Sequence, residues 1–164
     1  MAGNPWECGL LLETSADKRL VIRMLELWRR ARRADGLPHG SQLMPADAGA
    51  DASQLFQIDV LSPTGARFIH IGSGLHLPDW PQKPAPLVVE CPEDTVLSLA
   101  SRHWREIVTR RVPVTRGGLS RHLGGLVLYR SIMMPLVDDD GRIATILGAA
   151  NWRMVEEHPP TSVG

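Results

Sequence analysis

The clearest hydrophobic pattern in the chain is a helical stripe near its N-terminus. Apolar residues recur there at intervals of three and four positions, which places them on one face of a helix. They are Leu20, Val21, Met24, Leu25 and Trp28. The stripe predicts an amphipathic helix over 16–35, with four arginines in its last turns that complement the negative end of the helix dipole. Gly36 and Pro38 then end it.

Alternating apolar and polar residues indicate a β-hairpin further along the chain. Phe56, Ile58 and Val60 alternate with polar residues, and 67–71 reads as the returning strand after a Ser-Pro-Thr-Gly turn. Four prolines within 78–86 exclude a helix or a central strand in the stretch that follows.

The second half of the sequence predicts one helix and three strands. The helix is expected over 93–111, where an apolar stripe follows Pro92 and stops before Pro113. The strands are expected at about 112–121, 126–137 and 142–152. An Asp-Asp-Asp-Gly turn joins the last two strands as a hairpin.

Both faces of the 126–137 strand are largely apolar, so the sheet is expected to be covered on both sides. The 93–111 helix can cover one face, and the 16–35 helix or a partner chain must cover the other. The predicted organisation has four segments. They are an arm at 1–15, the amphipathic helix at 16–35, an α+β domain at 36–152 and a flexible tail at 153–164.

Composition narrows the class of protein without naming a function. The 164 residues contain 18 basic and 18 acidic side chains, and this zero net charge gives no global attraction to nucleic acids or membranes. No apolar run approaches the ~20 residues that span a bilayer, and the start lacks a signal-peptide pattern. Two cysteines are too few for a disulfide framework. We therefore expect a cytoplasmic, single-domain protein.

Three short motifs resemble the PAS fold, most closely the small stand-alone PAS-like proteins of bacteria. Leu-Trp-Arg-Arg at 27–30 ends the first helix, and Val-Thr-Arg-Arg-Val-Pro-Val at 108–114 leads into the third strand. The last hairpin carries Tyr-Arg at 129–130, Met-Pro-Leu at 134–136, Asp-Gly-Arg at 140–142 and Ile-Leu-Gly-Ala-Ala at 146–150. The resemblance implies a five-stranded antiparallel sheet with helices on one face and the N-terminal helix on the other.

The same resemblance implies a non-enzymatic sensory or adaptor module in signal transduction, which binds a small ligand, a partner protein or both. The candidate pocket lies between the 93–111 helix and the sheet, and its residues are His103, Trp104, Ile107, His70, Tyr129 and Met133. The sequence departs from the family at 78–86, where prolines replace the short helices that usually wall the pocket.

The apolar stripe of the first helix is also the candidate dimer or interaction surface. Its residues are Leu20, Val21, Met24, Leu25 and Trp28. Burial of this stripe against a second copy would supply most of a homodimer interface.

No metal-binding spacing is found among the six histidines. His103 lies on the helix where haem-binding PAS domains place an axial ligand, but we interpret it first as a boundary residue with one nitrogen in water. His70 is expected to face a covered side of the sheet as a hydrogen-bonded residue. Cys91, just before the predicted helix, is interpreted as structural rather than as a reactive thiolate.

Two other function classes stay open at the sequence level. A small α+β enzyme would use His103, His70 or Tyr129 as acid–base groups in a closed cavity. A nucleic-acid-associated adaptor would use the arginines around Trp28 to contact phosphates, although we favour helix-end charge or pairing with an acidic partner.

Overall fold

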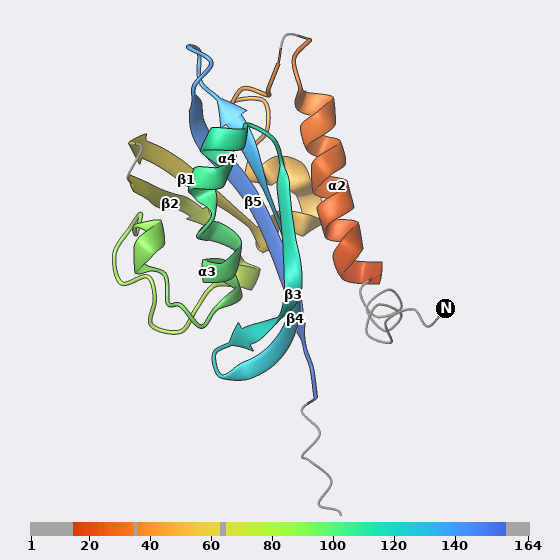
Figure 1. Cartoon of the computed structure of the whole chain (residues 1–164), viewed down its shortest axis with the longest axis vertical. Coiled ribbons are helices and arrows are strands. Elements are labelled where there is room, and N and C mark those ends of the chain that lie inside the picture. The colour runs from red at the N-terminus through yellow and green to blue at the C-terminus, as the bar shows by residue number, and fades with distance from the viewer. Residues whose placement is uncertain (1–14, 35, 63–64, 157–164) are drawn as a thin grey trace, which may run out of the picture.

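The computed structural model describes residues 15–34, 36–62 and 65–156. They form a layered α+β fold in which a single sheet separates two helical layers (Figure 1). All but the last residue of the predicted 1–15 arm, and the predicted tail from 157 onward, lie outside the described residues.

The sheet has five antiparallel strands in the order β2-β1-β5-β4-β3. The strands are β1 (Leu55–Ser62), β2 (Gly65–Ile71), β3 (Val114–His122), β4 (Gly125–Val137) and β5 (Ile143–Met154). All five predicted strands are therefore confirmed, with ends that differ from the prediction by a few residues. The chain makes the hairpins β1–β2 and β3–β4 at the two sides, and β5 inserts between β1 and β4.

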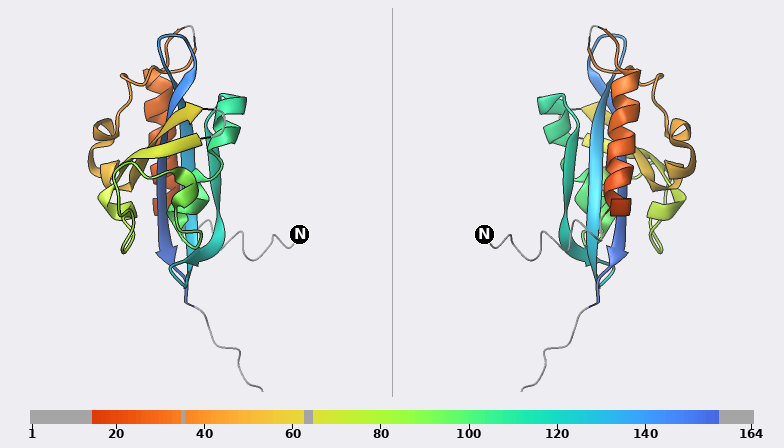
Figure 2. Two further views of the ribbon diagram at one scale, coloured as in Figure 1. Left: turned by 90° about the vertical axis from the view of Figure 1, so that its left-hand side faces the viewer. Right: turned by 90° about the vertical axis from the view of Figure 1, so that its right-hand side faces the viewer.

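Helix α2 (Ser15–Ala31) covers one face of the sheet, where it lies along β4 and β5 (Figure 2). Leu20, Met24 and Trp28 are buried against sheet residues of the same chain. Those sheet residues include Leu55, Ile132, Met134, Leu136 and Leu147. The predicted helix is confirmed, although it ends at Ala31 rather than at 35.

The 3-10 segment η1 (Pro45–Gln54) follows α2 and leads into β1. Arg23 on α2 makes two hydrogen bonds to the Asp51 carboxylate of η1, at 2.6 and 2.8 Å. This fork of two charge-assisted contacts ties α2 to the segment that enters the sheet.

Two short helices cover the opposite face, where the sequence predicted one continuous helix over 93–111. They are α3 (Val96–Ser101) and α4 (Trp104–Arg110). The Thr95 hydroxyl accepts a hydrogen bond of 3.2 Å from the N–H of Ser98, so α3 begins after Thr95 rather than at 93. His103, with φ −92° and ψ 20°, interrupts the helix before Trp104.

The proline-rich connection between β2 and α3 packs onto the same core. It contains the 3-10 turns η2 (Ser73–Leu75) and η3 (Val88–Glu90), and Leu75 and Val88 are buried. The Trp80 ring meets the Phe68 ring edge-on, with centroids 5.9 Å apart.

Gly148 on β5 makes room for the aromatic ring of Phe56 in this core. A Cβ atom at Gly148 would lie 2.1 Å from the Phe56 ring. The ring therefore rests directly on the backbone of the central strand, which only glycine permits at this position.

Candidate functional site

The six residues of the predicted pocket do not surround one cavity. Trp104, Ile107 and Met133 are buried in the core between α3, α4 and the sheet, and Tyr129 is half-buried against it. These side chains fill the layer in which the sequence placed a ligand. Four of the six predicted residues are thus packed in or against the core, and the pocket predicted from the whole set stays a prediction.

His70 was predicted to face a covered side of the sheet, and this prediction is wrong. The β1–β2 pairing joins Gln57 to His70 and Ile58 to Phe68, so Ile69 is an extra residue in a β-bulge. The bulge turns Ile71 toward the core and leaves His70 exposed.

Two of the three acid–base candidates of the enzyme alternative, His70 and Tyr129, lie far apart. His70 on β2 and Tyr129 on β4 are separated by β1 and β5, which is three strand spacings or about 14 Å. Groups this far apart cannot share a proton directly. His103 stands between α3 and α4.

His103 is half-buried, and burial is the main cause that lowers its pKa. The positive charges of Arg116 and Arg102 lower this pKa further. Haem ligation by His103 would need a cavity beside it, but Trp104 and Ile107 occupy the layer between α4 and the sheet. The residues present do not fit a haem. No group of three metal-ligating side chains occurs within the described ranges.

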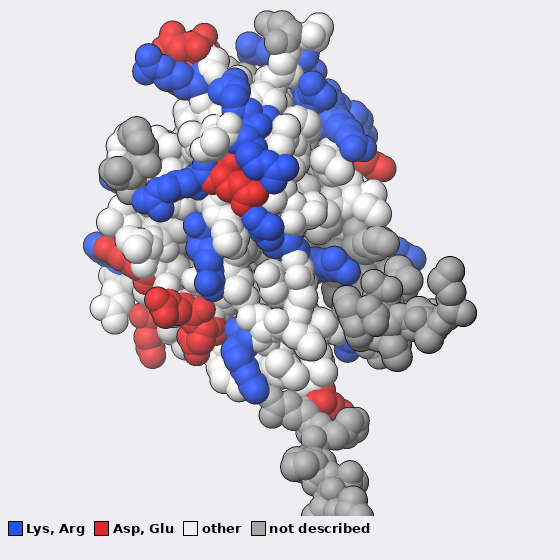
Figure 3. Space-filling view, in the orientation of Figure 1, with Lys and Arg blue, Asp and Glu red and all other residues white. Residues whose placement is uncertain are grey.

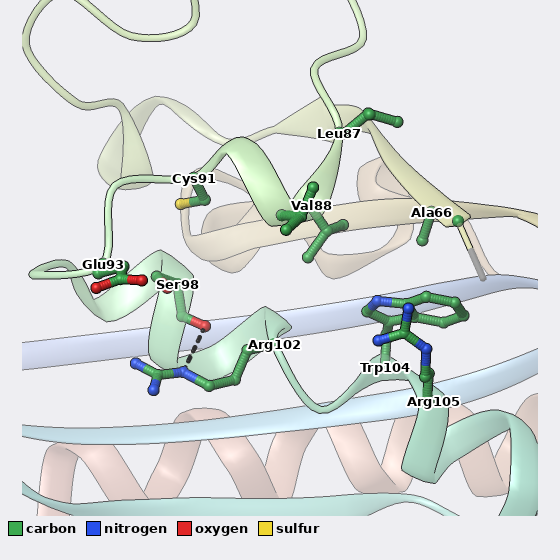
Figure 4. A pocket seen from close by; sticks show the side chains of 11 residues that line it. Ala66, Leu87, Val88, Cys91, Glu93, Ser98, Arg102, Trp104 and Arg105 are labelled. Carbon is green, nitrogen blue, oxygen red and sulfur yellow. Dashed lines mark hydrogen bonds between the residues drawn. The ribbon is translucent and has the colours of Figure 1, made fainter.

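An open cleft of about 530 Å³ lies on the outer side of this core, between α3–α4, the η3 segment and the start of β2 (Figure 4). Its lining combines apolar and charged side chains, and Trp104 is the one predicted pocket residue among them. The lining residues are Gly65, Ala66, Leu87, Val88, Val89, Cys91, Glu93, Ser98, Arg102, Trp104 and Arg105. The cleft, not the helix–sheet interior, is the candidate binding site.

Two arginines give the cleft a cationic side. The Arg105 guanidinium stacks on the Trp104 indole, 4.6 Å from the ring centroid. Arg102 donates from Nε to the Ser98 carbonyl at 3.4 Å, which holds its side chain along α3 (Figure 4). Glu93 lies at the far end of the cleft from Arg105. Together with the apolar wall at Val88, this arrangement suits a molecule with an apolar body and an anionic group.

Cys91 lines the same cleft but is not a nucleophile. It is 4% exposed, and burial raises the pKa of its thiol to about 11. A thiol with this pKa is almost wholly protonated at neutral pH, whereas the reactive species is the thiolate. The structural interpretation of Cys91 fits these observations.

His122 has a role that the sequence did not reveal. Its Nδ1 atom accepts a hydrogen bond of 3.0 Å from the N–H of Val96, the first residue of α3. Its ring also lies 4.4 Å from the Trp152 ring. His122 thus fixes α3 to the β3–β4 hairpin, and burial lowers its pKa. The 26 positions between His122 and Val96 hide this contact from any local pattern.

Arginines are also concentrated over α4 and β3, as the blue band of Figure 3 shows. Glu106 on α4 pairs with Arg110 at 2.8 Å and with Arg116 on β3. Because these contacts favour the ionised carboxylate, the pKa of Glu106 is lowered, with the Arg110 hydrogen bond as the largest cause.

Comparison with known proteins gives a distant structural likeness. No family model matches the chain, and no curated protein matches it. A helix long and apolar enough to cross a membrane is absent from the described part of the chain. A solved structure of a fungal LOV domain photoreceptor, a domain of the PAS family of folds, is 16% identical with a TM-score of 0.44. That match covers 78% of this chain and 89% of the other. The five-stranded antiparallel sheet with helices on both faces is the α+β architecture expected from the sequence.

Proposed function

We propose that the protein is a non-enzymatic PAS-like sensory or adaptor module of the cytoplasm, which binds a small ligand or a partner protein at the open cleft beside Trp104. The observation that carries this proposal is the cleft itself, which joins an apolar wall at Val88 to the cations Arg102 and Arg105. The layer between α3–α4 and the sheet is filled by core side chains, so a ligand is expected at the outer surface.

Binding at the cleft would act on the two short helices. Arg105 and Trp104 belong to α4, while Leu87 and Val88 belong to the connection from β2. A ligand that contacts both sides favours the arrangement in which they are close, and this shifts the population of helix positions. The sheet carries α2 on its other face, so strands β4 and β5 link the cleft side to the N-terminal helix.

The experiment uses 8-anilinonaphthalene-1-sulfonate, an apolar fluorophore with one sulfonate, as a probe of the cleft. We expect saturable fluorescence enhancement with the full-length protein. Arg105→Glu should weaken this binding about tenfold, the effect of losing one charge-assisted contact. The matched control is Arg30→Glu, an exposed arginine on α2 outside the cleft, which should leave the affinity unchanged. Equal affinities for wild type and both variants would reject the cleft as the site.

The homodimer expected from the sequence stays a prediction, but the structure limits which residues can form it. Leu20, Met24 and Trp28 are already buried in their own chain, so Val21 and Leu25 are the two of the five that keep partly exposed surface. Ile22, 48% exposed, lies beside them. A dimer through α2 predicts twice the chain mass in light scattering at tens of micromolar, and the monomer mass for Ile22→Glu.

A further inference from the structure

Strand β3 is an edge of the sheet that pairs on one side only. It pairs with β4 from Val114 to His122, and no other strand follows it in the sheet order. Within the described residues, no backbone hydrogen bond joins Val114–His122 to any element except β4. Every second residue of β3 therefore presents an N–H and a C=O group to an incoming strand.

A groove of about 380 Å³ lies beside this edge, between α2 and the start of β3. Its floor is apolar and its rim carries three arginines. The lining residues are Leu25, Trp28, Arg29, Arg32, Leu37, Arg111, Val112, Pro113, Thr115 and Ile132. The α2 members follow the spacing of one helix face, which explains why arginines and apolar residues meet there.

Four arginines lie at the end of α2 and directly after it. Among the described residues, no carboxylate forms an ion pair with any of the four. They are Arg29, Arg30, Arg32 and Arg33. Arg32 stacks on Trp28, with 5.3 Å from its guanidinium carbon to the ring centroid. In the described part of the chain, the three rim arginines, Arg29, Arg32 and Arg111, thus form no ion pair with a carboxylate.

We propose that the β3 edge and this groove bind an extended acidic segment of a partner protein. The segment would add a strand to β3, place an apolar side chain on the floor between Leu25 and Ile132, and pair its carboxylates with the arginine rim. Main-chain pairing at an open edge supplies affinity, and alternate side chains supply specificity.

A second copy of this chain is a poorer occupant of the edge. Antiparallel pairing of two β3 strands about their centre, Gly118, would place Arg116 opposite Ser120 and Thr115 opposite Arg121. Strand β3 carries no carboxylate, so a second copy would bring no counter-charge to the arginines of the rim. A nucleic acid would use the arginines but leave the strand edge and the apolar floor without a contact.

The test is selection of a random twelve-residue peptide library on the immobilised full-length protein. We expect enrichment of peptides in which Asp or Glu alternates with an apolar residue. The affinity of the enriched peptide is then measured by fluorescence anisotropy. Arg29→Glu should weaken binding at least tenfold, whereas Arg30→Glu, the adjacent arginine outside the groove, should not. Selection without an acidic consensus, or equal loss in both variants, would overturn the proposal.

Amide hydrogen exchange distinguishes strand addition from charge attraction alone. Bound peptide should slow exchange at 114–122, and the proposal fails if protection is confined to α2. The proposal also fails if the peptide does not bind while a single-stranded RNA of about twenty nucleotides binds and loses affinity in Arg29→Glu. Two results in the free protein would overturn the proposal. Protection of 114–122 that rises with protein concentration would mean that a second copy covers the β3 edge. Protection that disappears when residues 1–14 are removed would mean that those residues cover it.

Discussion

The indole Nε1 of Trp28 donates a buried hydrogen bond of 2.9 Å to the carbonyl oxygen of Pro135. Pro135 lies on β4 beyond Met133, the last residue that pairs with β3. The carbonyl oxygen has no strand partner on that side, and proline has no N–H that would need one. This contact therefore joins α2 to the sheet at the point where β3 is missing.

Trp28→Phe should lower the free energy of unfolding by about 1–3 kcal/mol, because the phenyl ring fills most of the space but leaves a buried carbonyl without a donor. The measurement is urea denaturation followed by circular dichroism. Ile22→Ala, at an exposed position of the same helix, serves as the control and should change stability by about 0.5 kcal/mol or less. Equal stabilities of wild type and Trp28→Phe would show that the hydrogen bond contributes nothing.

Gly148→Ala should destabilise the fold by about 1–3 kcal/mol, the usual cost of overpacking a core. The added methyl group would meet the Phe56 ring, which is held between β1, Phe68 and the centre of the sheet. Gly65→Ala is the matched control, because its new Cβ would meet only the Ser62 hydroxyl at 3.5 Å, an ordinary contact. Thermal unfolding compares the two variants, and a Gly148→Ala protein as stable as Gly65→Ala would contradict the packing described here.

Stability should fall as the pH is lowered through the range in which His122 titrates. Burial lowers the pKa of His122 below its ordinary value of 6.5, despite the opposing effect of Asp94. The neutral ring is thus favoured in the folded protein, so its contribution is complete above pH 6.5 and is lost as the pH falls through the lower folded pKa. His103 shifts in the same direction and adds to the loss.

Urea titrations at pH 8 and pH 5.5 measure this dependence. In His122→Asn, the side-chain amide oxygen can accept the Val96 N–H without titrating, so the loss between the two pH values should be smaller than in wild type. His103→Asn is the parallel variant for the second histidine. A wild-type protein equally stable at both pH values would exclude the proposed linkage.

Cys91 should resist thiol reagents while the protein is folded. In a Cys8→Ser background at pH 8, a thiol of pKa about 11 should react with a disulfide reagent about a hundredfold more slowly than an unperturbed cysteine. Addition of urea should restore the ordinary rate. Rapid reaction in native buffer would mean that the cleft opens far enough to expose the sulfur.

The sequence predicted elements well where a periodic pattern extended over several turns or a full strand. The stripe through Leu20, Met24 and Trp28 predicted α2 and its buried face, and the apolar faces of 126–137 predicted a sheet covered on both sides. The break within 93–111 was missed because the apolar stripe continues through both α3 and α4, while the interruption at His103 leaves no mark on the pattern.

The candidate site was less predictable, because its walls come from distant parts of the chain. Ala66, Val88 and Arg105 meet at the cleft from β2, η3 and α4. His70 was misplaced for a different reason. A single extra residue, Ile69, reverses the alternation of inward and outward positions along β2, and a bulge of this kind cannot be read from hydrophobicity alone.

The position of β5 between β1 and β4 has a consequence for how the molecule is made. The two hairpins β1–β2 and β3–β4 are synthesised before β5, and the hairpins do not pair with each other. They become one sheet only when β5 (Ile143–Met154) is synthesised and pairs with β1 on one side and with β4 on the other. The whole sheet therefore cannot form before the last strand is made. A chain truncated before Ile143 would contain two hairpins that do not pair with each other, rather than a smaller domain.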